Sequence, residues 1–574
     1  MLLLFPFHLF SFSSLFLTRM ASVSVSILLF MTAAAAASPS AEAGTSSNAA
    51  AAPAITKGPS TNEIIVYWFD IVLLCVLGLF FLAALPRMYG RFSIASERSR
   101  GFLFRSEKND MSQFPRALSV YDLRDQFTGS TKFDAVSDQS HTLAIHNTYA
   151  RSEKEWIISP SPPRSPPTHV RTLSSVLHPF LSPLSYSVSP SMTIGKVTLI
   201  GIYLLGMIIV VFIDGGNPLA SPARLGYIAT SQIPVAVALG TKNNVVGMLI
   251  GMGYEKLNFL HRWVGIVTFF AANLHTIGYI YKWAINNDLR EELQKPYIVS
   301  GTVGLIGLQL LYLGSLGFVR RRAYTFFLMA HIIGLIIFFV GICYHEKVCI
   351  KYVLLGVVIY SVDHLMRLMK TRFATARIMN VPELGLTRVE LPTVTAGWRA
   401  GQHVRIRVLS TEMGWLGWSV AHPFTIANAS ESASERGLVL MCKKVGGWTN
   451  CLYTAASRAG EYTSEKGIGV QRELKVVIEG PYGGPGNMVM SSYSSVLLVT
   501  GGSGVSFALS QAEEIVQDIC NGKSAVRFLE VVWVTQTTDS VHPLVPAFAG
   551  LIDSVSGTPG VVLKVSVFCS RASG

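Results

Sequence analysis

Two apolar stretches with the same pattern decide the architecture of this chain: HRWVGIVTFFAANLH at residues 261–275 and HIIGLIIFFVGICYH at residues 331–345. Each begins and ends with a histidine, and the two histidines are 14 residues apart. In an α-helix, 14 residues rise by about 21 Å and return to within about 40° of the same face. Each stretch therefore predicts a helix that presents two histidines on one face at two depths.

The composition places these helices in a membrane. Of the 574 residues, 50% are hydrophobic and 14% are charged, a balance typical of multispanning membrane proteins. Arginines at 320–322 and basic residues at 367–377 lie on one side of the predicted bundle, which is the cytosol by the positive-inside rule. The predicted spans are 64–85, 194–213, 225–240, 261–283, 298–318, 324–344 and 352–369.

One predicted span separates the two histidine-bearing helices, so they run parallel. His261 is then level with His331, and His275 is level with His345. A lone buried histidine is usually a packing residue, but ionisable side chains kept within lipid mark ligands or pathways. A bare metal site is disfavoured, because its ligands must converge on one point and residues about 21 Å apart on a helix cannot. Each level therefore predicts a haem held by two imidazoles.

Before the bundle, the one charged residue of the span 64–85 is Asp70, which is either a functional carboxylate within the membrane or a solvated residue near its interface. Residues 1–43 are typical of a signal peptide or an uncleaved anchor. The polar region 86–192 includes a Ser/Pro-rich stretch, 159–167, and is predicted to be a flexible cytosolic linker. The net charge of +13 comes from residues beside apolar runs, which indicates membrane topology and lipid contact and argues against nucleic-acid binding.

The C-terminal third predicts two further domains. Short β-branched runs at 373–489 favour a small antiparallel barrel, and 490–574 alternates strand and helix like a nucleotide-binding α/β domain. Its predicted elements are strands at 496–500, 528–535 and 561–568 and a helix at 506–520.

Two loops in this region have the composition of phosphate sites. The first is Gly501, Gly502, Ser503 and Gly504, which lie between a strand and a helix, where small residues let a diphosphate approach the helix N-terminus. The second is the segment 444–450, where Lys444 could offer a cation and the backbone around Gly447 and Thr449 could offer N–H groups to FAD phosphates. A plain hairpin turn is the alternative for this segment.

Several motifs resemble those of the ferric reductase and NADPH oxidase superfamily, and of its ferric reductases in particular. The run 254–265 resembles the haem-binding region. Downstream, His422-Pro423-Phe424-Thr425 resembles the flavin motif, Gly480-Pro481-Tyr482-Gly483 the domain-joining motif, and 501–507 the pyridine-nucleotide loop. The resemblance implies two haems b on His261, His275, His331 and His345, FAD on the barrel and NADPH on the α/β domain.

The resemblance also implies the reaction: a ferric reductase of the plasma membrane that passes electrons from cytosolic NADPH through FAD and two haems to an external ferric iron chelate. A superoxide-producing NADPH oxidase and a non-catalytic membrane subunit are the alternatives. The family's nucleotide domain continues past its third strand to a Cys-Gly-Pro type motif, whereas this chain stops at Gly574, shortly after Cys569. The domain is therefore expected to be incomplete and to bind NADPH weakly. The oligomeric state stays open.

Acidic residues near the outer ends of the predicted spans have two interpretations. They could supply oxygen ligands to a hard cation such as ferric iron, or they could form a plain solvated face. They are Asp214, Asp288, Glu291, Glu292 and Glu346.

Overall fold

A computed structural model gives the fold of this chain. It describes residues 60–106, 142–144, 166–170, 177–215, 217, 221–414, 417–431, 437–461 and 472–570. The chain divides into two compact units. The first contains the long helices and a short two-stranded sheet of β2 (Ser187–Ser189) and β3 (Met192–Thr193), and the second contains the two larger sheets. The predicted region 1–43 lies outside the described residues.

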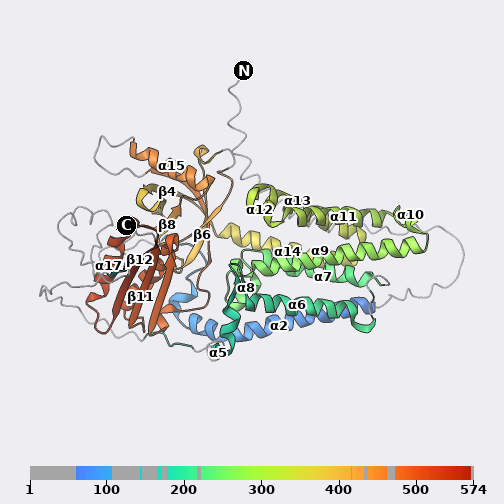
Figure 1. Ribbon diagram of the computed structural model, residues 1–574, viewed down its shortest axis with the longest axis horizontal. Helices are drawn as coiled ribbons and strands as arrows, with labels where there is room; N and C mark the ends of the chain where they lie inside the picture. The colour runs from blue at the N-terminus through green and yellow to red at the C-terminus, as the bar shows by residue number, and fades with distance from the viewer. Residues whose placement is uncertain are drawn as a thin grey trace, which may run out of the picture. The chain divides into compact units, whose positions relative to one another are not determined.

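The first unit is a bundle of long helices (Figure 1). Within the described residues, six helices are long and apolar enough to cross a membrane. They are α2 (Thr61–Phe92), α6 (Ile194–Phe212), α9 (Tyr254–Ile285), α11 (Pro296–Gly314), α13 (Tyr324–His345) and α14 (Val348–Met369). Shorter helices are α7 (Ala223–Gly240), α8 (Val245–Ile250), α10 (Leu289–Glu292) and α12 (Gly317–Arg322).

One predicted span differs from the others. Residues 225–240 form most of α7, which is helical but is not among the six helices apolar enough to cross a membrane. The reason is its buried polar side chains, Arg224, Ser231 and Gln232. They are satisfied inside the bundle: Arg224 donates to the carbonyl oxygen of Ile213 at 2.6 Å, and Gln232 accepts from the Tyr203 hydroxyl at 3.0 Å. This helix is covered by its neighbours, so its polar groups do not face lipid.

Glycines bring α11 and α13 into backbone contact. A Cβ at Gly307 would lie 2.6 Å from the backbone nitrogen of Phe338, and one at Gly334 would lie 2.7 Å from the carbonyl oxygen of Gly307. The lipid interior is itself apolar, so the hydrophobic effect does not drive helices together there. Small-residue contacts such as these stabilise helix pairs by close packing instead. The pair therefore forms a rigid frame, and α13 carries two of the predicted histidines.

The second unit begins with a six-stranded antiparallel sheet in the order β7-β6-β9-β4-β5-β8. A bridge between Ile426 and Leu440 nearly closes it into a barrel. Trp398, Ile378 and Leu440 are fully buried in its core. The strands are β4 (Thr371–Val381), β5 (Leu386–Leu391), β6 (Gln402–Val408), β7 (His422–Thr425), β8 (Leu438–Lys443) and β9 (Arg472–Gly483), with helix α15 (Gly447–Glu461) after β8.

The last part of this unit is a parallel sheet covered by helices. Strands β10 (Ser495–Gly501), β11 (Phe528–Thr535) and β12 (Val562–Cys569) pair in that order, and β1 (Thr142–Ala144) adds an antiparallel edge strand. Helices α16 (Val505–Cys520) and α17 (Val545–Ser556) share one hydrophobic core with it. The predicted fold class, apolar helices followed by a barrel and an α/β domain, is confirmed.

The first part of the region predicted as a flexible linker, 86–192, is ordered structure. Residues 86–92 continue α2, and the 3-10 turn η1 (Ala95–Arg98) follows. Phe104 is then buried in the barrel core, and Gly101 donates its backbone N–H to the carbonyl oxygen of Gly397 at 3.0 Å. The packing signal was missed because the apolar residues here are few and follow no helical or strand period. Most of the Ser/Pro-rich stretch lies outside the described residues.

Candidate functional site

The four predicted histidines form two pairs across α9 and α13. The ring centroids of His261 and His331 are 6.2 Å apart, and those of His275 and His345 are also 6.2 Å apart. Two imidazoles bound through one nitrogen each to a metal between them, at about 2 Å per bond, have centroids about 6 Å apart. Both pairs therefore have the spacing of two imidazole ligands of one metal.

The second nitrogen of each ring is already bonded. Nδ1 lies 2.8 Å from the carbonyl oxygen of Ala236 in His261, and 2.9 Å from that of Pro222 in His275. In His345 it lies 2.8 Å from the carbonyl oxygen of Tyr297, and in His331 it lies 2.9 Å from Oγ of Ser315. A carbonyl can only accept, so in those three rings Nδ1 carries the proton and Nε2 is left as the metal-binding nitrogen.

Glycines of neighbouring helices make room for three of these rings. A Cβ at Gly226 would lie 2.8 Å from the ring of His275, and one at Gly240 would lie 3.0 Å from the ring of His261. A Cβ at Gly301 would lie 2.5 Å from Nδ1 of His345. Sequence reasoning missed these residues, although Gly226 and Gly240 show the same spacing of 14 residues as the histidines they contact.

The donor set fits a haem better than a bare ion. Among the described residues, no group of three or more His, Cys, Asp or Glu side chains is placed to hold a metal ion. Each pair supplies two ligands, and a porphyrin supplies the other four positions around an iron. The assignment of the four histidines as haem ligands stays a prediction, and the spacing and tautomers just described support it.

The predicted flavin motif is strand β7 itself, at the edge of the barrel. His422 and Phe424 lie two residues apart and thus on one face of the strand. Their rings stack against Trp448, with centroid distances of 4.4 and 5.9 Å and interplanar angles of 29° in both cases. Burial and the nearby Arg405 guanidinium lower the pKa of His422, which keeps this imidazole uncharged. The result is a half-buried aromatic face that suits a flat ring system.

The segment 444–450 is neither a hairpin nor an open loop. Helix α15 begins at Gly447, and the Thr449 hydroxyl accepts the backbone N–H groups of Val445 and Gly446 at 3.0 and 2.9 Å. Those two amides are therefore used within the turn. Lys444 is exposed, with its ammonium 4.6 Å from the ring centroid of Tyr453. Binding of an FAD phosphate here thus depends on Lys444 and on the start of α15, and it stays a prediction.

The predicted domain-joining motif ends strand β9. Tyr482 is buried, and its hydroxyl donates to Glu479 at 2.9 Å. Arg367 donates to both oxygens of Glu479, at 3.0 and 3.2 Å. Gly480 and Gly483 have positive φ angles of 152° and 66°, which favour glycine. These positions fix the backbone between the barrel and the α/β domain, and no ligand contact follows from them.

The glycine loop lies where the sequence predicts. Gly501 ends β10, residues Gly502–Gly504 form a 3-10 turn, and α16 starts at Val505 without a side-chain cap. The uncapped start of a long helix favours an anion. A Cβ at Gly502, whose φ is 51°, would lie 3.9 Å from the ammonium of Lys443. Lys443 was missed because it lies on β8, far away in sequence.

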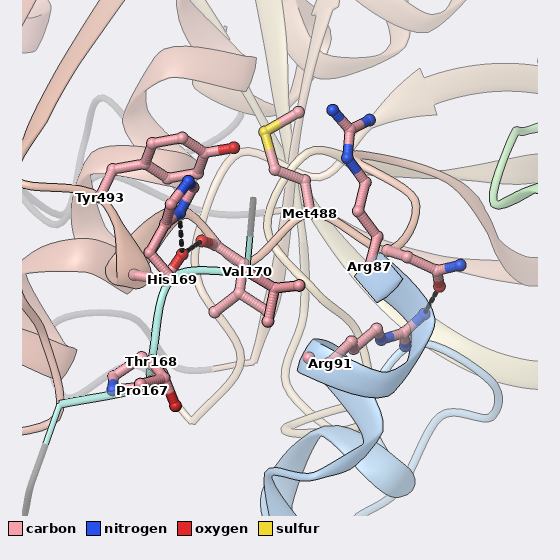
Figure 2. Close-up of a pocket in the computed structure, with 12 residues that line it drawn as sticks. Arg87, Arg91, Pro167, Thr168, His169, Val170, Met488 and Tyr493 are labelled. Atoms are coloured by element: carbon pink, nitrogen blue, oxygen red, sulfur yellow. Dashed lines mark hydrogen bonds between the residues drawn. The ribbon is translucent and has the colours of Figure 1, made fainter. Parts of the chain in front are cut away.

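A separate small pocket in this unit contains none of the predicted residues. Figure 2 shows His169 and Tyr493 on one side and Arg87 and Arg91 on the other. The His169 ring lies 4.4 Å from that of Tyr493, and Nδ1 lies 3.3 Å from Oγ of Ser492. These contacts pack residues 166–170 against the α/β domain, so the pocket lies where these two segments meet.

Comparison with known proteins identifies three consecutive families. "Ferric reductase like transmembrane component" matches residues 225–342, an FAD-binding domain matches 370–486, and "Ferric reductase NAD binding domain" matches 493–573. The first match covers all four histidines, the second covers β7 and α15, and the third covers the glycine loop. The predicted resemblance is confirmed.

Individual relatives agree with the family matches. The chain is 28% identical over 352 residues to a probable cell surface ferric reductase of Aspergillus oryzae, a match that covers 57% of this chain and 44% of that protein. It is 27% identical to ferric reductase transmembrane component 6 of Saccharomyces cerevisiae, covering 52% and 42%. It is 26% identical to ferric reduction oxidase 4 of Arabidopsis thaliana, covering 52% and 41%. The chain spans less than half the length of these relatives.

Proposed function

We propose that this chain, which belongs to the ferric reductase superfamily, takes electrons from cytosolic NADPH and delivers them to ferric iron on the other side of the membrane. The observation that carries the proposal is the pair of histidine sites at two depths, with both centroid distances at 6.2 Å. A single site could store an electron, but two sites about 21 Å apart along the helix form a path across most of a bilayer.

The histidines hold and orient the redox groups. His261 and His331 lie toward the end of the bundle that carries the basic helix α12, and His275 and His345 lie toward the opposite end. When bound, two haems supply one-electron transfer and a flavin supplies the change from a two-electron to a one-electron carrier. Two histidine side chains would hold each haem, so the acceptor would take its electron without a direct bond to the iron.

The second unit handles the donor side. The aromatic face of His422, Phe424 and Trp448 suits the flavin ring. The uncapped start of α16 and the ammonium of Lys443 suit the diphosphate of a pyridine nucleotide. Because basic residues follow α14 and form α12, the positive-inside rule puts this unit in the cytosol. This orientation and the names of the relatives support a plasma-membrane location and an external ferric chelate as the acceptor.

The acidic residues at the outer end are unequal as candidates for attracting ferric iron. Glu292 already forms an ion pair with Lys295, at 2.5 Å. Glu346 directly follows His345 and lies beside the outer histidine pair in sequence. We therefore assign Glu346 the larger share of cation attraction near the outer haem and Glu292 the smaller.

The test is to express the chain in cells that lack surface reductase activity, supply NADPH to inverted membrane vesicles, and follow ferrous chelate and superoxide together. The expected result is ferrous chelate formation that depends on NADPH. Superoxide at the full electron flux without ferrous iron would replace the proposal with an oxidase. Haem that NADPH cannot reduce at all would indicate a non-catalytic membrane subunit.

A further inference from the structure

Three of the four histidines are held by the same arrangement, a glycine against the ring and a backbone carbonyl bonded to Nδ1. His275, His261 and His345 pack against Gly226, Gly240 and Gly301, respectively. In each case Nδ1 bonds to the backbone carbonyl four residues before the glycine, namely Pro222, Ala236 and Tyr297. A helix carbonyl has a second lone pair that can accept from a side chain, and the missing Cβ lets the ring reach it.

His331 is held differently. Its neighbour is Ser315, the residue that directly follows α11; Ser315 lies 14 residues after Gly301, just as Gly240 lies 14 residues after Gly226. Ser315 thus occupies the position at which the other three sites have glycine. Its hydroxyl donates to the carbonyl of Leu311, four residues earlier, at 2.6 Å, and lies 2.9 Å from Nδ1 of His331. The hydroxyl stands between the ring and the carbonyl that the ring would otherwise reach.

The direction of these two bonds is fixed. The single hydroxyl proton of Ser315 goes to Leu311, so the Ser315 oxygen can only accept from His331. His331 therefore carries its proton on Nδ1, which leaves Nε2 as the metal-binding nitrogen. A hydrogen bond from the far nitrogen fixes the tautomer and orientation of a ligand histidine and raises its basicity, which favours the more oxidised metal.

We propose that Ser315 is a positioning residue for the haem ligand His331, relaying to Leu311 the hydrogen bond that the other three histidines make directly to a carbonyl. The inference rests on the proposed function, because it assumes that the histidine pairs hold haem. It makes the two sites unequal. At the His275 and His345 level both Nδ1 hydrogen bonds go to backbone carbonyls, whereas at the His261 and His331 level one of them goes to a side chain that substitution can remove.

Three substitutions of Ser315 distinguish a hydrogen-bond relay to His331 from a general packing role of the Ser315 side chain. Ser315→Ala keeps the Cβ that covers the Leu311 carbonyl but removes the hydroxyl, so Nδ1 loses its acceptor. Ser315→Thr keeps the hydroxyl. Ser315→Gly removes both the hydroxyl and the Cβ, which lets His331 reach the carbonyl as the other three rings do. Thr302→Ala is the matched control, since Thr302 on α11, the helix that Ser315 caps, donates to the carbonyl of the residue four positions earlier, Ile298, at 3.0 Å.

The measurement is a redox titration of the haem absorbance in membranes containing the full chain, with haem per chain counted in parallel. In Ser315→Ala we expect one of the two haem components to shift to a higher midpoint potential, with its metal affinity about tenfold or more lower. Ser315→Thr, Ser315→Gly and Thr302→Ala should stay close to the unaltered protein. An unchanged titration in Ser315→Ala, or equal shifts in the alanine and glycine variants, would overturn the relay and leave the proposed function standing. If the unaltered chain held no haem, both would fall.

Discussion

The helical bundle and the barrel with its α/β domain present their sites in opposite ways. In the bundle, the proposed haem ligands are the side chains of four histidines, and three of them are held by the backbone carbonyls of Pro222, Ala236 and Tyr297 and by glycines of α7 and α11. In the second unit, the proposed pyridine-nucleotide site uses the backbone N–H groups of the glycine loop at the start of α16, with the ammonium of Lys443 beside them. A site made of side chains depends on the space around each one, whereas a site made of backbone depends on local conformation.

The largest effect that separates the two regions is expected in the bundle. Gly301→Ala places a methyl carbon 2.5 Å from Nδ1 of His345, so the ring must move away from its partner. We expect the loss of about half of the bound haem, measured by the pyridine haemochrome method on purified protein. Gly265→Ala on α9 is the control, because a Cβ there meets nothing within 4 Å. Equal haem in both variants would show that the glycine contacts do not position the ligand.

The next largest effect concerns the aromatic face of the barrel. Replacing Phe424 and Thr425 with alanine removes one aromatic contact and one hydroxyl from the predicted flavin site. Contacts of these two kinds together contribute about 2 kcal/mol, so FAD binding should weaken roughly 30-fold. The check is a fluorescence titration with FAD, and the haem content of the same sample should not change. Full flavin occupancy in the double variant would refute this assignment.

A smaller effect on nucleotide binding is expected from two adjacent lysines, Lys443 at the proposed NADPH site and Lys444 at the proposed FAD site. Lys443 lies beside Gly502, whereas Lys444 points to Tyr453 near the start of α15. A partly exposed charge contributes about 1 kcal/mol to binding an anion, so Lys443→Ala should weaken NADPH binding roughly fivefold and leave FAD binding unchanged. Lys444→Ala should do the reverse. Titration of each nucleotide against each variant measures this, and identical profiles for the two variants would remove the distinction.

The smallest effect is a pH dependence of stability in the second unit. Burial raises the pKa of Glu514 on α16 to about 7, although Arg399 and Arg100 nearby oppose the shift and Glu97 and Asp518 add to it. In the unfolded chain a glutamate titrates at about 4.3. Between these values the folded state binds more protons, so the unfolding free energy falls as pH rises.

Glu514→Gln removes this fall, because the amide does not ionise. From pH 5 to pH 8 the melting temperature of the unaltered chain should drop by roughly 3 °C more than that of the variant. Thermal unfolding of the full detergent-solubilised protein at the two pH values measures the difference. Parallel curves for the two proteins would mean that Arg100 and Arg399 keep Glu514 ionised throughout.

Features that depend on residue spacing or on a local motif could be predicted from the sequence. Strands β10, β11 and β12 could be predicted because their apolar runs are bounded by turns. The pairing of four histidine rings across two helices could be predicted because 14 residues return a helix to the same face. Their partners were not found, because Ser315, Lys443 and the glycines of α7 act through contacts made by folding. The role of residues 86–106 was missed for the same reason: burial of Phe104 in a barrel almost 300 residues later leaves no periodic signal.

The pairing of the histidines across α9 and α13 is the central claim, and haem counting in double variants tests it most directly. His275→Ala and His345→Ala should each remove half of the haem, and combining them should remove no more, because both hold the same group. Combining His261→Ala with His275→Ala, on one helix, should remove all of it. If the His275 and His345 double variant lost all haem, or if either single variant kept both haems, the cross-helix pairing would be contradicted.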